Sequence, residues 1–139
     1  MIKKHGSAKW KGSLQEGTGR ISTESGALSN TPYGFNTRFE GAAGTNPEEL
    51  IGAAHAACFS MALSNILGDK GITPDNIETT STVHLSMQDG PSIEKAHLDV
   101  VITADGDKDT IMACAKEAET GCPVSKVLDC EITMDARIA

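Results

Sequence analysis

The sequence predicts an α+β fold, with helices on one face of an antiparallel sheet, for a chain of 139 residues. Three observations predict it. Short segments in which polar and apolar residues alternate, separated by turns, fill the first third of the chain. A long apolar stretch follows, and further segments of alternating polarity flank a second helical pattern. A chain of this length buries a core large enough to need no disulfide staples, so we expect a single domain over residues 1–139.

Three strands are expected before the long apolar stretch. In residues 7–13 polar residues alternate with apolar or small ones, which predicts a first strand, and a Gly-Thr-Gly turn leads into a second strand at 20–23. The aromatic residues between positions 33 and 39 share parity, so they would face one side of an extended third segment while Arg38 points to the other. The N-terminal part is therefore predicted to be a three-stranded β-meander.

The long apolar stretch is expected to be a central helix. Thr45–Glu49 supplies a polar cap, a proline in the first turn and two acids near the positive end of the helix dipole. Leu50 to Leu67 is almost entirely apolar or small, and Gly68 and Gly71 end the helix. Such a helix is buried on most sides, which is difficult within one small domain. We therefore expect an intertwined homodimer in which partner helices pack together.

The C-terminal half is expected to hold a β-hairpin, a second helix and a last strand. Residues 77–87 and 93–103 flank the turn signal Asp89-Gly90, which predicts the hairpin. Residues 105–120 form a capped helix that a Gly-Cys-Pro sequence breaks, and residues 130–138 form the last strand. The inner face of this helix is expected to carry Ile111, Met112, Ala115 and Ala118.

Charge and hydropathy limit the partners of the chain. The formal net charge of −7 argues against nucleic acid or an anionic membrane surface as a partner. No hydrophobic run approaches the roughly 18 residues of a membrane span, and the start, MIKKHG, lacks the apolar region of a signal peptide. We therefore expect a cytoplasmic protein. In a reducing compartment, cysteines are more often free, catalytic or metal-binding than paired in structural disulfides.

The four cysteines differ in their surroundings. Cys114, within the second helix, and Cys130, which opens the last strand, are expected to be ordinary buried or half-buried residues. Periodicity alone places Cys58 on an apolar helix face, where core is the default. Cys122 precedes Pro123, which can begin another helix, and a cysteine at a helix N-terminus has a stabilised thiolate. Local sequence leaves open whether Cys122 is reactive or an ordinary loop residue.

Metal and hydrolase chemistry find little support. The cysteines contain no closely spaced pair, and no clear ligand set is formed by His55, His84 and His97, so we expect no metal site. His55 lies three residues before Cys58 on the same helix, which makes a Cys-His hydrolase one alternative. No glycine-rich oxyanion elbow accompanies that pair.

Three motifs resemble the OsmC/Ohr family of thiol-dependent hydroperoxide reductases, and the OsmC branch most closely: Asn46–Leu50 (NPEEL), Ala53–Phe59 (AAHAACF) and Gly121–Ser125 (GCPVS). Further similar segments are Ser22–Gly26, Pro32–Phe39 and the ending from Val127 to Thr133. The resemblance covers essentially the whole chain. It implies the OsmC-like fold and a cysteine-based peroxidase without metal, haem or bound cofactor.

The resemblance also implies the residues of the site. Cys58 corresponds to the reactive cysteine and Cys122 to the resolving cysteine, while Arg38 and Glu48 correspond to the arginine and glutamate. A thiolate attacks one peroxide oxygen, the resulting sulfenic acid condenses with the second cysteine, and an external dithiol, by family resemblance of the lipoyl type, restores both thiols. Cys114 and Cys130 themselves match no family motif, so the resemblance implies no role for them.

Residue chemistry fits these roles. Burial alone would raise the pKa of the Cys58 thiol, whereas a guanidinium beside it reverses this and stabilises the departing oxyanion. Glu48 would hold Arg38 by a bidentate pair. Apolar walls from Phe39, Phe59 and neighbours such as Met61 suggest a preference for organic hydroperoxides over hydrogen peroxide. The family name implies a role in oxidative or osmotic stress.

Helix geometry predicts that the sites are shared. Glu48 and Cys58 are ten residues apart on one helix, about 15 Å along its axis. Arg38 and Glu48 would therefore more easily reach Cys58 of a second copy, which places the active sites at the interface of a homodimer. The alternative from another class is a non-catalytic member of the fold that acts as a binding or scaffold protein.

Overall fold

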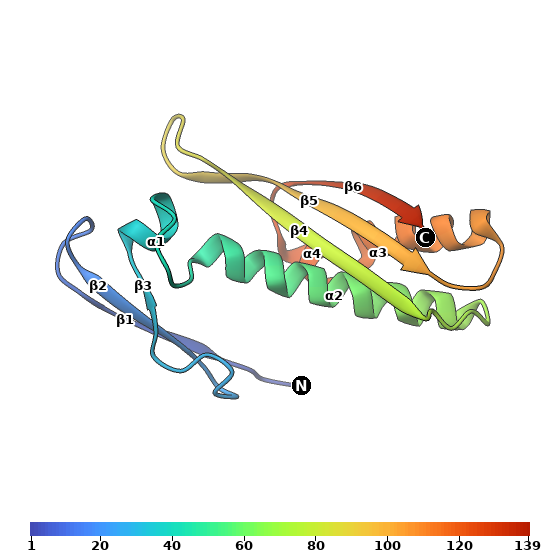
Figure 1. Ribbon diagram of the computed structural model, residues 1–139, viewed down its shortest axis with the longest axis horizontal. Coiled ribbons are helices and arrows are strands. Elements are labelled where there is room, and N and C mark those ends of the chain that lie inside the picture. The colour runs from blue at the N-terminus through green and yellow to red at the C-terminus, as the bar shows by residue number, and fades with distance from the viewer. The chain divides into compact units, whose positions relative to one another are not determined.

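The computed structural model describes all residues, 1–139, and divides into two compact units, Met1–Leu50 and Ile51–Ala139 (Figure 1). The first unit holds a small sheet and a short helix, and the second holds a larger sheet with its helices. The long helix α2 begins in the first unit and continues through the second. The expectation of a single domain over residues 1–139 stays a prediction.

The predicted N-terminal meander is present in the first unit. Its antiparallel strands, in the order β1-β2-β3, are β1 (Gly6–Lys11), β2 (Thr18–Thr23) and β3 (Thr31–Tyr33). Gly19 in the middle strand pairs with Trp10 on one side and Tyr33 on the other, and a side chain there would collide with both rings. Glycine at this position lets the two rings meet at a centroid distance of 5.5 Å.

The expected extension of the third strand to residue 39 is wrong, because Phe35–Phe39 forms a short helix, α1. The Thr37 hydroxyl accepts from the Gly34 N–H at 2.8 Å and donates to the Gly34 carbonyl at 3.0 Å, which fixes the start of this turn. Phe35 and Phe39 are four residues apart, a spacing that fits both a strand face and a helix face. Their rings pair at 4.9 Å across one helical turn.

The central helix α2 spans Pro47–Asp69 and begins where the sequence predicts. The Asn46 side chain accepts from the Glu49 N–H at 2.8 Å and so caps its first turn. Only one face is buried within the chain, and it carries Gly52, His55, Phe59, Leu63 and Leu67. Met61 on another face is 76% exposed, so burial on most sides, which is expected only with a partner helix, stays a prediction.

Helix α2 is also long and apolar enough to cross a membrane by length and composition, which the search for hydrophobic runs missed. One such helix is weak evidence for a membrane span, because the core helix of a soluble protein passes the same test. Phe59, Leu63 and Leu67 are completely buried among sheet and helix residues of the second unit, as in a core helix.

The second unit contains a mixed sheet in the order β4-β5-β6, formed by β4 (Asn76–Ser86), β5 (Ser92–Thr103) and β6 (Glu131–Ile138). The predicted hairpin joins β4 and β5, and Asp89 and Gly90 at its tip both adopt positive φ. The expected all-antiparallel sheet is wrong, because β6 pairs with β5 in parallel. The crossover through α3 (Lys108–Gly121) and α4 (Pro123–Val127) returns the chain to the end where β5 begins.

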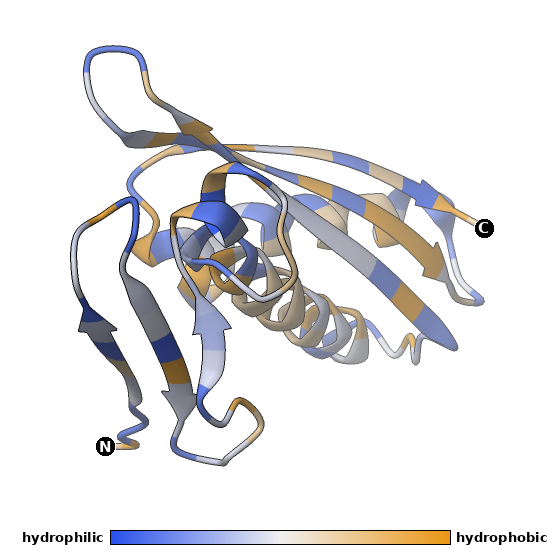
Figure 2. Ribbon diagram, turned by 60° about the vertical axis from the view of Figure 1, so that its left-hand side comes forward, coloured by the Kyte–Doolittle hydropathy of each residue, from blue (hydrophilic) through white to orange (hydrophobic).

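The core of the second unit lies between its sheet and its helices. Burial alternates along strand β5: Ala96, Leu98, Val100 and Ile102 are buried, and the residues between them are partly or fully exposed on the other face of the sheet. Figure 2 shows polar and apolar residues interspersed along the strands of this sheet. Helix α3, capped by the Asp107 carboxylate at 2.9 Å from the Thr110 N–H, buries Ile111, Ala115 and Ala118 as predicted. Met112 is 38% exposed, so its prediction is wrong.

Candidate active site

Arg38 and Glu48 form a forked ion pair in the first unit. The Arg38 Nη2 donates to Glu48 Oε1 at 2.6 Å, and Nε lies 3.1 Å from both carboxylate oxygens. Arg38 comes from α1 and Glu48 from the first turn of α2, so the local helix of residues 35–39 sets the direction of the guanidinium. The Arg38 side chain is 34% exposed, whereas that of Glu48 is 13% exposed. The carboxylate thus fixes one edge of a guanidinium that still reaches solvent.

An apolar pocket of about 300 Å³ lies against this ion pair in the first unit. Its lining combines Arg38 with Trp10, Leu14, Tyr33, Phe39 and Pro47. The guanidinium also stacks over the Phe39 ring at 5.3 Å. The sequence prediction of Phe39 as an apolar wall agrees with this pocket, whereas Phe59 is completely buried in the core of the second unit.

Cys58 and Cys122 are neighbouring free thiols in the second unit. Cys58 lies on α2 and is half-buried, and Cys122 lies between α3 and α4 and is completely buried. Helix α4 places Cys122 there, because the Ser125 N–H donates to its sulfur at 3.3 Å. The predicted site residues thus meet as two pairs, one in each unit, and the approach of one pair to the other stays a prediction.

The surroundings of Cys58 work against its ionisation. Burial raises the pKa of the Cys58 thiol, as the sequence reasoning expected, and the neighbouring Cys122 thiol raises it further. The Val124 N–H lowers the pKa of Cys58 by a hydrogen bond, which offsets only part of the increase. The net effect of these surroundings is a raised pKa, which a cation beside the sulfur would oppose.

Sequence reasoning missed a hydrogen-bond chain that ends at Cys122. The ring nitrogens of His55 lie 2.8 Å from Ser81 Oγ and 2.8 Å from Ser125 Oγ. Ser125 Oγ is in turn 3.3 Å from Cys122 Sγ. Although Ser125 belongs to the GCPVS motif, its contact with His55 could not be read from the sequence, because the chain joins α2, β4 and α4 across long stretches of sequence.

The same contacts weigh against a Cys-His hydrolase. Both ring nitrogens of His55 are engaged by serine hydroxyls, so neither is left to act on Cys58. Burial lowers the pKa of His55 and keeps the ring neutral.

The other two cysteines behave as predicted. Cys114 is buried in the core between α3 and the sheet. Cys130 is half-buried, and burial together with the Asp129 carboxylate raises the pKa of its thiol, although the Ala96 backbone lowers it in part.

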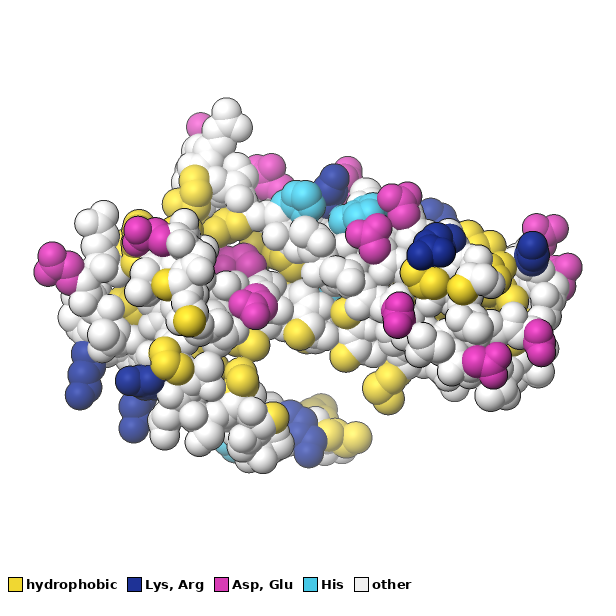
Figure 3. Space-filling view, in the orientation of Figure 1, with side chains coloured by type: hydrophobic (Ala, Val, Ile, Leu, Met, Phe, Trp, Pro, Cys, Tyr) yellow, Lys and Arg dark blue, Asp and Glu magenta, His cyan; other side chains and the backbone are white.

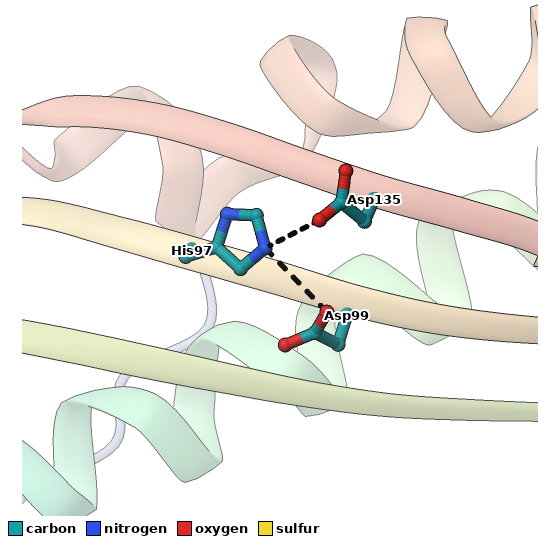
Figure 4. Close-up of side chains that lie close together, drawn as sticks. All are labelled: His97, Asp99 and Asp135. Carbon is teal, nitrogen blue, oxygen red and sulfur yellow. Dashed lines mark ion pairs between the residues drawn. The ribbon is translucent and has the colours of Figure 1, made fainter.

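One cluster could offer ligands to a metal ion, and it lies away from the thiols. His97 Nε2 is 3.5 Å from Asp99 Oδ1 and 3.3 Å from Asp135 Oδ2 (Figure 4). His97 Nδ1 pairs with Thr133 Oγ1 at 2.6 Å. His97 and Asp99 alternate with the buried residues of β5, so the cluster lies on the face of the sheet turned away from the core. Figure 3 shows histidine and acidic side chains side by side on the surface. The expectation of no clear ligand set missed it, because parallel pairing of β5 with β6 aligns Asp99 with Asp135.

The chain is similar in sequence to one protein family and to several known proteins. The family model described as OsmC-like protein matches residues 39–137. The chain is 54% identical to peroxiredoxin OsmC of Escherichia coli (strain K12) over 139 residues, which cover 99% of this chain and 97% of the relative. It is 32% identical to the organic hydroperoxide resistance protein OhrB of Bacillus subtilis (strain 168), over 78% of this chain and 79% of the relative.

Solved structures show the same fold. An OsmC-like protein from Vibrio cholerae superposes with a TM-score of 0.77 at 15% identity, covering 99% of this chain and all of the other. The crystal structure of Bacillus subtilis OhrB superposes with a TM-score of 0.69 at 24% identity, covering 96% and 98%. The extent of the family match and the identity over the full length lead to one conclusion: the chain belongs to the OsmC-like protein family.

Proposed function

We propose that the chain is a thiol-dependent peroxidase that reduces organic hydroperoxides, and hydrogen peroxide less well, in the response to oxidative and osmotic stress. The observation that carries this proposal is the pair of free, neighbouring thiols formed by Cys58 and Cys122, which are far apart in the sequence. Relatives named a peroxiredoxin and an organic hydroperoxide resistance protein support it.

The reaction needs no metal or haem, since the electrons come from thiols. The Cys58 thiolate attacks one peroxide oxygen, the O–O bond breaks, and the second oxygen leaves as an alcohol once protonated. Cys58 is then a sulfenic acid, which Cys122 converts to a disulfide with release of water.

Arg38 would supply a cation that opposes the raised pKa of Cys58. Its guanidinium lowers the pKa of a nearby thiol and stabilises the negative charge on the leaving oxygen. The fork to Glu48 holds the guanidinium in one orientation, and the adjoining apolar pocket fits the hydrocarbon part of an organic hydroperoxide. A hydrogen peroxide molecule has no group to bury there, which explains the expected preference.

Regeneration requires an external dithiol, for which the family resemblance suggests a lipoyl-type reductant. Cys122 is completely buried and Cys58 only partly, so an incoming thiolate would reach the Cys58 sulfur of the disulfide. We place the reaction in the cytoplasm, where such reductants keep thiols reduced.

We further propose a homodimer with active sites at the subunit interface. No hydrophobic side chain of the first unit is buried, and every residue of β1 is exposed, although an isolated small sheet is only marginally stable. Helix α2 also exposes an apolar face that includes Ala53, Ala57 and Met61. A second copy would cover both surfaces and bring its Arg38 to Cys58 of the first.

Subunit exchange tests the shared site. Arg38→Ala and Cys58→Ser proteins are mixed, unfolded together and refolded. If sites are shared, the heterodimer regains one complete site from two inactive parents, and activity returns. Mixtures as inactive as their parents would show that each site is built from one chain.

Steady-state peroxide reduction tests the activity itself. With dihydrolipoamide as reductant, cumene hydroperoxide should be consumed faster than hydrogen peroxide, and Cys58→Ser should abolish both reactions. Cys114→Ser removes a thiol that the mechanism does not use and serves as the matched control. Full activity in Cys58→Ser would refute the proposed function.

A further inference from the structure

His55 is a buried histidine that the proposed reaction does not use. Its side chain is 0% exposed, and its Nδ1 and Nε2 each lie 2.8 Å from a serine hydroxyl, on Ser81 and Ser125. Close packing of α2 on β4 makes this possible, since a Cβ at Gly52 would lie 2.7 Å from the Ser81 carbonyl oxygen. His55, one turn further along α2, therefore reaches the strand directly.

The hydrogen bonds run in one direction from Cys122 to His55. The Cys122 thiol donates to Ser125 Oγ at 3.3 Å, so the single hydroxyl hydrogen of Ser125 is free to point to His55 Nε2. Nε2 is then the acceptor, and the Nδ1–H donates to Ser81 Oγ. The Ser125 N–H also donates to the Cys122 sulfur at 3.3 Å, which holds the sulfur beside the Ser125 hydroxyl.

We propose that Ser125 and His55 form a proton relay that deprotonates Cys122 while it attacks the sulfenic acid on Cys58; this inference rests on the proposed function. The Cys122 sulfur supplies the electron pair for the S–S bond as the S–O bond of Cys58 breaks. The Cys122 proton passes to Ser125 Oγ, and the hydroxyl proton of Ser125 passes to His55 Nε2. The departing hydroxide takes a proton from solvent and His55 later returns one, so the net product is water.

The surroundings of His55 suit a base. Its contacts are Ser81 from β4, Ser125 from α4 and, through Ser125, the Cys122 thiol, while Cys58 lies on the next turn of α2. Burial lowers the pKa of His55, and both hydrogen-bond partners of the ring are uncharged serine hydroxyls. The ring is therefore neutral near pH 7 and can accept a proton, and the lowered pKa favours its release afterwards.

The test separates the two chemical steps in the full chain. Reduced protein is mixed with one equivalent of cumene hydroperoxide, and quenched samples are analysed by mass for Cys58 sulfenic acid and for the disulfide. Ser125→Ala should slow disulfide formation about 100-fold at pH 7, the usual contribution of a positioned base. The deficit should shrink as the pH approaches about 8.5, where thiols ionise without help. Ser125→Thr, which keeps the hydroxyl, should restore the rate.

Two further variants keep the proposal falsifiable. His55→Gln retains a hydrogen-bonding side chain but cannot take up a proton, so it should show the same slow, pH-dependent step as Ser125→Ala. Ser60→Ala is the matched control, because its hydroxyl also joins α2 to β4, at 2.7 Å from Thr79 Oγ1, but has no link to Cys122. It should leave disulfide formation unchanged.

The outcomes distinguish the relay from the proposed function. If wild-type protein forms neither the Cys58 sulfenic acid nor the Cys58–Cys122 disulfide, the proposed function itself fails. If sulfenic acid forms but Ser125→Ala resolves it at the wild-type rate, the relay alone is refuted. A deficit of the same factor at every pH would also overturn it, because a purely structural role slows the step without changing its pH profile.

Discussion

Glu48→Gln tests how much the orientation of Arg38 contributes. The substitution keeps the shape of the side chain but removes its charge and turns one oxygen into an amide that repels the guanidinium. Unit charges 4 Å apart gain about 4 kcal/mol at an effective dielectric of 20, whereas exposed pairs contribute at most about 1 kcal/mol. The Arg38 side chain is 34% exposed, so we take about 1.5 kcal/mol for the contribution of the Arg38–Glu48 pair, which is close to the value for exposed pairs.

That free energy corresponds to a roughly tenfold loss in the rate of Cys58 oxidation by cumene hydroperoxide. Stopped-flow measurement under pseudo-first-order conditions gives this rate directly. Glu49→Gln is the control, because it makes the same change one residue later, where the side chain contacts Asn46 and not Arg38. If Glu48→Gln reacts as fast as the control, Arg38 does not depend on this carboxylate, and its proposed orientation is refuted.

The structure predicts three further effects on stability. Gly52→Ala should lower the free energy of unfolding by about 1–2 kcal/mol in urea titrations, because its Cβ would press on the Ser81 carbonyl. Gly68→Ala is the control, because open space surrounds this glycine, and it should be neutral or slightly stabilising. Equal effects of the two substitutions would contradict the packing argument. Phe59→Ala should cost about 3–5 kcal/mol, and a loss below 1 kcal/mol would contradict its place in the core. Because burial lowers the pKa of His55, only the unfolded state takes up a proton on this ring near pH 6, so the free energy of unfolding should fall as the pH drops below about 6.5. Calorimetry of His55→Gln should show a smaller fall over the same pH range. An equal fall in the variant and the wild type would refute the contribution of His55.

Much of the fold followed from local patterns. The cap at Asn46, the length of α2, the hairpin and the Asp107 cap are all set by neighbouring residues, so sequence reasoning reached them. Two predictions of secondary structure failed: residues 35–39 form a helix and not a strand, which has a local cause, and β6 pairs in parallel, which has a non-local cause. A spacing of four between Phe35 and Phe39 fits either period, and the parallel pairing of β6 depends on where the crossover through α3 and α4 returns the chain.

The candidate site divides in the same way. Cys58, Cys122, Arg38 and Glu48 could be named only through resemblance to a family, because periodicity alone favoured core for Cys58. The hydrogen bonds of His55 could not be predicted, since Ser81 and Ser125 reach it from separate elements brought together by tertiary packing.

The central claim is that Cys58 and Cys122 form a redox pair, and the stoichiometry of thiol loss tests it most directly. Reduced protein is titrated with cumene hydroperoxide, and free thiols and disulfide-linked peptides are measured by mass. The account predicts that one equivalent of peroxide rapidly consumes two thiols, both recovered in a Cys58–Cys122 disulfide, and that Cys122→Ser instead accumulates a sulfenic acid on Cys58. Slow oxidation spread over all four cysteines would contradict it.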